Sequence, residues 1–120
     1  MVRMNHEKIH IEQEKELGLI GFLIIYIFNS LWIMITKWDL NKAYMANLFE
    51  IESYVYEKDF EYLSRRKRWM IFRKDDKIKE YRKQIFDKPT KIVDRVMCIV
   101  LITVICIFIA GAICAIIFKN

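Results

Sequence analysis

Two long runs without charge divide the chain. Residues 17–36 hold 20 positions, and residues 96–118 hold 23 positions, without an Asp, Glu, Lys or Arg. A helix of about 20 apolar residues is long enough to cross a hydrocarbon core of ~30 Å. The pattern predicts an all-α membrane protein. Residues 96–118 form its C-terminal transmembrane helix, and residues 17–36 form an apolar helix or a bent helical hairpin.

The first apolar run has a polar interruption near its middle, at Asn29 and Ser30. A side-chain amide in apolar surroundings needs hydrogen-bond partners, so this pair indicates a helix contact, a cavity or a turn of the chain. Before the run, Asn5 is a predicted helix N-cap. We expect the helix that follows it to continue past Gly18 into the apolar run, because glycine lowers helix propensity without ending a helix in lipid.

Between the apolar runs, helical periodicity appears in two places. A first amphipathic segment follows Asp39, a predicted N-cap, and a second begins at Asp75 or Asp76. Pro89 ends the second segment, and Thr90 is placed to cap the last helix. The apolar stripes are Leu40, Tyr44, Leu48, Ile51, Val55 and Tyr62 in the first segment and Ile78, Tyr81 and Ile85 in the second.

The net charge of +5 resides between the two apolar runs, where residues 37–95 carry 16 Lys and Arg against 11 Asp and Glu. Beside a membrane, such an excess marks the cytoplasmic side. The segment therefore predicts membrane lipid as a partner, and no nucleic acid is expected. Within it, the basic cluster at residues 65–68 precedes Trp69 and Phe72 and suits contact with anionic headgroups. An ordinary solvated charged face fits the cluster equally well.

The cysteines Cys98, Cys106 and Cys114 all lie in the second apolar run, at intervals of eight residues. Successive members are rotated by about 80° on a helix, so they neither share a face nor form a metal cluster. They are predicted to be small packing residues, and no disulfide framework is implied. Together with Thr103 and Ala110, the last two form a small-residue strip along which another helix could pack.

The candidate metal-binding residues lie just before the first apolar run, in the HExxH sequence His6-Glu7-Lys8-Ile9-His10. Two histidines four residues apart on a helix are rotated by only about 40°, so both can face one ion. As a general base, Glu7 can take a proton from a water molecule that the ion activates. The sequence predicts a site for Zn²⁺ here, provided that the rest of the chain completes it.

The wider string at residues 5–17 reads NHEKIHIEQEKEL. It resembles the active-site helix of short membrane-associated zincin-like proteins, which reads close to NHExIHxxQxxEL and leads straight into an apolar segment. The resemblance continues through KAY, FEIESY and EKDFEYL and covers roughly residues 5–72. It implies a zincin-like membrane-associated region at 1–72, before a basic amphipathic linker helix at 73–95 and the transmembrane helix at 96–118.

The same resemblance implies a ligand set of the gluzincin type. In such peptidases the third ligand is a glutamate on a later helix, in an ExxA pattern that residues 50–53 (EIES) fit with serine in place of alanine. The implied ligands are His6, His10 and Glu50, and Glu52 is the reserve third ligand. The implied function is that of a zinc metallopeptidase that hydrolyses peptide bonds near the membrane surface.

This site depends on the path of the first apolar run. A straight spanning helix would hold the two histidines about 30 Å from Glu50, on the opposite side of the membrane. A hairpin that turns at residues 29–30 would bring Glu50 back to the level of the histidines. We therefore expect the run to turn or bend, with both ends cytoplasmic and residues 96–118 as the only spanning helix.

A different class of protein fits the same pattern. If both runs cross the membrane, both termini lie outside and the zinc site cannot form. The protein would then be a non-catalytic two-span accessory or scaffold protein whose basic cytoplasmic segment binds lipid or a partner. In that arrangement Asn29 and Thr103 lie at matching depths and could hydrogen-bond across the helix pair.

Overall fold

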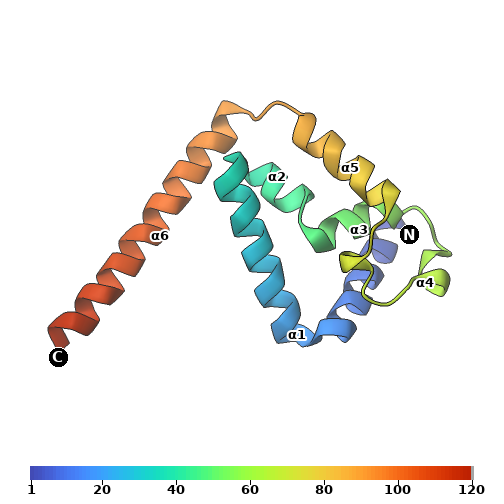
Figure 1. Cartoon of the computed structure of the whole chain (residues 1–120), viewed down its shortest axis with the longest axis horizontal. Helices are drawn as coiled ribbons and strands as arrows, with labels where there is room; N and C mark the ends of the chain where they lie inside the picture. Colours follow the sequence, from blue (N-terminus) through green and yellow to red (C-terminus); the bar gives the residue numbers. More distant parts are fainter. Residues whose placement is uncertain (120) are drawn as a thin grey trace.

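The computed structural model describes residues 1–119, which are helical with short connections and contain no strand. Figure 1 shows a long first helix bent into a V, a set of short helices that returns between its arms, and a last helix that projects away from the rest. The elements are α1 (Val2–Lys37), α2 (Leu40–Met45), α3 (Leu48–Tyr56), α4 (Tyr62–Arg65), the 3₁₀ turn η1 (Met70–Phe72), α5 (Asp76–Asp87) and α6 (Ile92–Lys119).

The bend in α1 lies at Gly18, whose φ of 71° and ψ of 157° are outside the helical region. Residues with a side chain rarely adopt a positive φ of this kind, whereas glycine does so at little cost. The bend divides α1 into a charged arm, residues 2–17, and an apolar arm, residues 19–37. The predictions of an unbroken helix through Gly18 and of a turn at Asn29–Ser30 are therefore wrong, although a bend as such is present.

Asn29 and Ser30, the polar pair in the apolar arm of α1, form a contact with the start of α3. The Asn29 side chain accepts a hydrogen bond from the backbone N–H of Leu48 at 2.9 Å. Asn47 donates to the Ser30 hydroxyl at 2.7 Å and to the Tyr26 carbonyl at 3.0 Å. Asn47 also caps α3, so the first amphipathic segment is divided into α2 and α3 rather than forming one helix.

The charged arm of α1 is attached to the opposite end of α3. Asn5 lies inside α1 rather than at its N-cap, and its side-chain amide donates to the carbonyl groups of Tyr56, Glu57 and Asp59 at 3.0–3.3 Å. These carbonyls lie at and just beyond the last turn of α3, where backbone acceptors lack partners within the helix. The two arms of α1 therefore hold α3 between them by hydrogen bonds at both of its ends.

The second amphipathic helix agrees with its prediction. The Asp75 carboxylate accepts from the backbone N–H of Ile78 at 2.9 Å and so caps α5, whose residue Ile85 is buried. At the end of α5 and just after it, Lys42 of α2 donates to the carbonyl groups of Phe86 and Lys88 and to the Thr90 hydroxyl. Thr90, the residue predicted to cap the last helix, thus receives a hydrogen bond from Lys42 of α2. The last helix, α6, begins two residues later, at Ile92.

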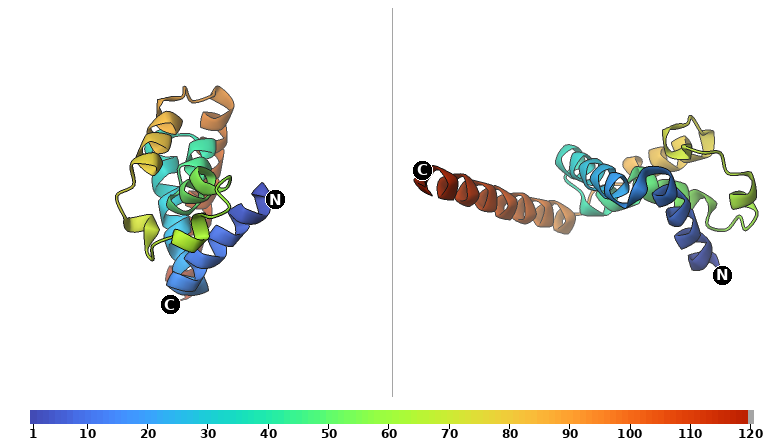
Figure 2. Two further views of the ribbon diagram at one scale, coloured as in Figure 1. Left: turned by 90° about the vertical axis from the view of Figure 1, so that its right-hand side faces the viewer. Right: turned by 90° about the horizontal axis from the view of Figure 1, so that it is seen from below.

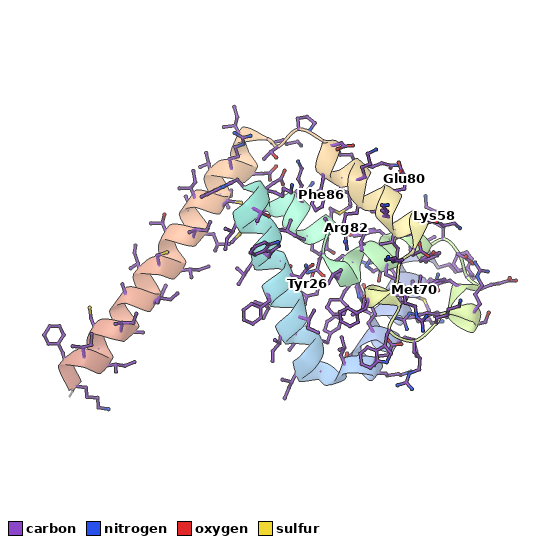
Figure 3. All side chains as sticks on the ribbon, in the orientation of Figure 1. Tyr26, Lys58, Met70, Glu80, Arg82 and Phe86 are labelled. Atoms are coloured by element: carbon purple, nitrogen blue, oxygen red, sulfur yellow. The ribbon has the colours of Figure 1, made fainter. Side chains whose placement is uncertain are left out.

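Two helices, α1 and α6, are long and apolar enough to cross a membrane. In α6 only Cys98 is buried, and side chains project from the helix on all sides (Figure 3). The apolar arm of α1 differs, because α2 and α3 cover one of its faces and bury Ile33 and Met34. Elsewhere the arm is exposed, and its exposed apolar residues include Ile20, Ile24, Ile27, Phe28, Trp32 and Ile35. Figure 2 shows how far α6 extends from the remaining helices.

Replacing Gly18 by alanine is expected to destabilise the protein by roughly 1–3 kcal/mol, because the added Cβ forbids the positive φ on which the bend depends. No neighbouring atom lies within 4 Å of that Cβ, so the cost is confined to the backbone. Denaturant unfolding in detergent micelles, followed by circular dichroism, measures it. Gly21→Ala is the matched control, since its Cβ would meet only Leu17 at an ordinary 3.6 Å and alanine favours a helix. Equal stability of the two variants would contradict the role assigned to Gly18.

Candidate metal centre

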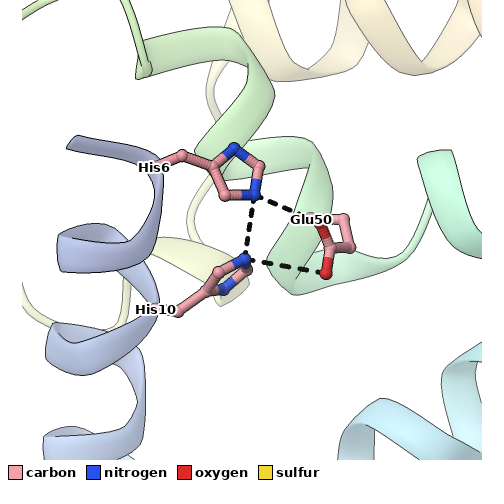
Figure 4. Close-up of side chains that lie close together, drawn as sticks. All are labelled: His6, His10 and Glu50. Atoms are coloured by element: carbon pink, nitrogen blue, oxygen red, sulfur yellow. Dashed lines mark hydrogen bonds and ion pairs between the residues drawn. The ribbon is translucent and has the colours of Figure 1, made fainter. Parts of the chain in front are cut away.

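The charged arm of α1 and the first turns of α3 bring three sequence-predicted side chains together (Figure 4). The Nε2 atoms of His6 and His10 lie 3.1 Å apart. The Glu50 carboxylate lies 3.4 Å from His6 Nε2 through one oxygen and 3.6 Å from His10 Nε2 through the other. All three side chains are buried or half-buried.

These separations match the dimensions of a zinc site. Zinc binds imidazole nitrogen and carboxylate oxygen at about 2.0–2.2 Å, so neighbouring ligands of a tetrahedral ion lie about 3.3 Å apart. In the protein the two nitrogens lie 3.1 Å apart, and they lie 3.4 and 3.6 Å from different oxygens of Glu50; with one ligand atom from each residue, the three atoms lie within 4.8 Å of one another. An ion within bonding distance of all three groups therefore requires movements of the side chains.

The second ring nitrogen of each histidine is held by an acceptor. His6 Nδ1 lies 3.1 Å from a Glu57 carboxylate oxygen, and His10 Nδ1 lies 2.8 Å from Gln13 Oε1. The orientation of the Gln13 amide is determined by its NH₂ group, which donates to the Phe49 carbonyl at 3.1 Å and to Glu52 at 2.9 Å. The Gln13 oxygen must therefore face His10, and each neutral imidazole carries its hydrogen on Nδ1.

This tautomer leaves three acceptors facing one another. Both Nε2 lone pairs point into the cluster, and the buried Glu50 Oε2 has no hydrogen-bond donor among the described residues. The other Glu50 oxygen accepts from the Tyr26 hydroxyl at 3.0 Å, which fixes the carboxylate in place. Buried acceptors without a donor are costly, and a cation or a proton at their centre removes that cost. In metal sites, a ligating histidine usually donates its other ring N–H to an acceptor that orients the ring, and His6 and His10 have such acceptors here.

The electrostatics of the cluster favour ionised partners. Burial alone would lower the pKa of His10, but interactions with Glu50 and Gln13 and the nearby Glu7 charge outweigh it and raise that pKa above 6.5. Burial alone would raise the pKa of Glu50, but His10, the Tyr26 hydroxyl and His6 outweigh it and lower that pKa. Each shift favours the charged form of its group, because the two partners carry opposite charges when His10 is protonated and Glu50 is ionised.

The predicted general base lies at the edge of the cluster. Glu7 is exposed, and its charge is close enough to contribute to the raised pKa of His10. Its role as a base stays a prediction.

The reserve ligand lies elsewhere. Positions 50 and 52 are rotated by about 200° on a helix, so Glu52 faces away from the histidines. It is fully buried and accepts from Gln13, from the Tyr62 hydroxyl at 2.8 Å and from Arg66 at 2.6 Å. The described arrangement thus brings Glu50, and not Glu52, to His6 and His10.

The position of Arg66 differs from the expectation for the basic cluster at residues 65–68, which is contact with lipid headgroups or a solvated face. Its guanidinium group is buried between Glu52 and Glu16, which it contacts at 2.6 and 2.7 Å. It is therefore an internal ion-pair partner that lipid headgroups cannot reach. Nothing local in the sequence marks it among its basic neighbours, because Glu16 lies 50 positions away.

The side chains that position the ligands were not predicted from the sequence. They are Gln13, Tyr26 and Glu57, together with Tyr54, whose ring packs against His6 with the ring centroids 4.8 Å apart. Tyr26 could have been recognised from the sequence, because a phenol within an apolar run needs a hydrogen-bond partner. Glu57 could not, since nothing near it in the sequence indicates contact with a residue 51 positions earlier.

Comparison with known proteins found no matching family model, no matching curated protein and no matching solved structure. The resemblance to zincin-like proteins therefore stays a prediction, and the candidate site is supported by its geometry.

Replacing Arg66 by alanine is expected to lower the unfolding free energy by about 3–5 kcal/mol, because Glu52 would keep its burial and lose its cation. Arg65→Ala is the matched control. Its side chain is 57% exposed beside Asp59, and such a surface pair contributes about 0–1 kcal/mol. Denaturant unfolding of both variants measures the difference, and similar losses would show that position 66 has no special role.

The pH dependence of metal binding has a defined direction. A proton on His10 competes with a metal, and the raised pKa means that this competition begins at a higher pH than for an unperturbed histidine. Apparent zinc affinity, measured by chelator competition, is expected to fall about tenfold per pH unit below that pKa. Glu7→Gln removes one of the charges that raise it, so the decline should start at a lower pH. An unmoved profile would contradict this coupling.

Without metal, the sign of the linkage differs for the two partners. The stabilisation from His10 is fully present below 6.5 and is lost as the pH rises through its raised folded-state pKa. The stabilisation from Glu50 is present above 4.5 and is lost as the pH falls through its lowered folded-state pKa. Together the two groups are expected to contribute most to the stability of the metal-free protein between pH 4.5 and 6.5.

Proposed function

We propose that the protein is a membrane-bound metallopeptidase of the zincin type, in which His6, His10 and Glu50 hold Zn²⁺. One observation carries the proposal: the Nε2 atoms of two histidines lie 3.1 Å apart, and the Glu50 carboxylate, one oxygen of which has no hydrogen-bond donor among the described residues, lies 3.4 and 3.6 Å from them. Three such ligands leave a fourth position free on a tetrahedral ion, which is typical of catalytic rather than structural zinc sites.

The residues of the chain have distinct roles in this proposal. Gln13 and Glu57 hold the histidines with Nε2 toward the ion, and Tyr26 holds Glu50. Zinc would supply a Lewis acid that polarises a peptide carbonyl and makes water acidic enough to lose a proton near neutral pH. Glu7, exposed beside His6, receives that proton as the general base.

The bend at Gly18 supports a site on one side of the membrane. His10 precedes Gly18 by eight residues and Tyr26 follows it by eight, so the two positions lie across the V from each other, and Glu50 lies between them. The charged arm exposes residues such as Lys8 and Glu14, which are too costly to place in hydrocarbon. The proposal therefore has α6 as the spanning helix and the apolar arm of α1 touching lipid through its exposed face.

On this proposal, both ends of α1 and the basic segment 37–95 lie on the cytoplasmic side, and peptide bonds are hydrolysed near the membrane surface. The competing function, a non-catalytic two-span accessory protein, requires the apolar arm of α1 to cross the bilayer. The neighbouring helices would then enter it as well, with the buried polar groups of α3 at mid-depth. The energetic cost of that placement favours the peripheral one.

Metal analysis of the purified protein tests the proposal directly. We expect about one zinc ion per chain, lost in His6→Ala and in Glu50→Gln and retained in Glu14→Gln, an exposed acid on the same arm. Cobalt loaded in place of zinc should give the visible absorption of a tetrahedral site in the wild type and in Glu14→Gln but not in the two ligand variants. Wild-type protein that holds no zinc and binds none when it is added would overturn the zinc centre and leave the accessory function.

Glu7→Gln separates metal binding from catalysis. The variant should keep its zinc, because position 7 is not a ligand, and should lose peptidase activity by a factor of about 10² or more, the typical contribution of a general base. The measurement is cleavage of a peptide library in detergent, alongside zinc content. Unchanged cleavage would exclude Glu7 as the base.

A further inference from the structure

An open pocket of about 540 Å³ lies where α1 ends and α6 begins. It is lined by Thr36, Lys37, Trp38, Arg95 and Ile99. In Figure 1 the two long helices meet near this junction and diverge from it toward their far ends. The pocket is therefore at the common end of the two helices that are apolar enough to enter a membrane.

The charge of the pocket is uncompensated. Its two charged lining residues are Lys37 and Arg95, and no acidic side chain lines it. Among the described residues neither forms an ion pair, and the Lys37 ammonium group lies 5.0 Å from the centroid of the Phe86 ring. Two cations that line one pocket without an anion attract a negatively charged group such as a phosphate.

Of the remaining lining residues, Trp38 and Ile99 are apolar, and Thr36 is a small polar residue. Trp38 and Ile99 are 44% and 54% exposed. One turn from Thr36, the exposed Trp32 continues the same face of α1, and one turn from Ile99, the exposed Thr103 continues the face of α6. A cationic end with a neighbouring tryptophan, followed by apolar surface, is the order of groups that a phospholipid meets at a membrane interface.

We propose that this junction pocket binds one anionic phospholipid of the bilayer. Its phosphate lies between Lys37 and Arg95, and its acyl chains follow the exposed faces of α1 and α6. A free phosphate would use only the two cations and leave the apolar walls bare. The occupant rests on the proposed membrane location but not on the zinc centre, since none of the pocket residues touches the cluster at His6.

The position of the pocket gives the lipid a structural role. Within the described residues, α6 contacts the rest of the protein mainly through α2. A lipid held by Lys37 of α1 and Arg95 of α6 therefore bridges the two helices on the membrane side, where protein contacts are sparse.

The test uses the whole chain in a neutral detergent, titrated with palmitoyl-oleoyl phosphatidylglycerol and, separately, with the matching phosphatidylcholine. Native mass spectrometry counts the bound lipids. We expect one phosphatidylglycerol to bind more tightly than phosphatidylcholine. The double variant Lys37→Gln/Arg95→Gln should weaken it by about twentyfold to thirtyfold, since each cation near a membrane surface contributes about fivefold. Lys67→Gln/Lys74→Gln removes the same charge from positions away from the junction and should change it by less than about threefold.

Two further measurements distinguish a bound lipid from a free phosphate. Ile99→Trp fills the apolar wall and keeps both cations, so it should also weaken phosphatidylglycerol binding, whereas glycerophosphoglycerol, which lacks acyl chains, should not compete. Equal losses in the two charge variants, or competition by the chain-free headgroup, would overturn the lipid site. Flotation with phosphatidylcholine vesicles and zinc analysis of the same preparations report separately on membrane location and on the metal centre.

Discussion

The backbone conformation of Gly18 decides where the other parts of the molecule lie. Its positive φ turns α1 into two arms, one charged and one apolar. A straight helix of the same length would carry His10 far from Tyr26, and Glu50 could not contact both. The bend instead creates a space between the arms that α3 occupies. The cluster at His6 and the polar contacts of the apolar arm both follow from that single residue.

The helix α3 is held in this space by side-chain amides and by charge rather than by apolar packing alone. Asn47 and Asn29 attach its first turn to one arm, and Asn5 attaches its last turn to the other. Buried amides of this kind specify one arrangement, because any shift of α3 would leave donors and carbonyl groups unpaired. The geometry of the candidate metal centre thus depends on hydrogen bonds that lie outside it.

Two glutamates on α3 show how neighbouring residues of one type acquire different roles. Glu52 faces Arg66 and is neutralised within the protein, whereas Glu50 faces the Nε2 atoms of two imidazoles. Gln13 connects the two environments, since its NH₂ group binds Glu52 and its oxygen orients His10. The ion pair and the candidate metal centre are therefore coupled through one amide, because the ion pair positions the side chain that orients His10.

The sequence alone determined the features that depend on neighbouring residues. The two apolar runs, the cap at Asp39, the start of the second amphipathic helix at Asp75 or Asp76 and the common face of His6 and His10 all follow from local sequence. Tertiary structure decided the rest: the bend at Gly18, the selection of Glu50 and the burial of Arg66. These depend on contacts between residues up to 50 positions apart and on which of several glycines, acids and cations meets a partner. Local periodicity carries no information about that choice, because the energy that decides it is that of burying polar groups with their partners.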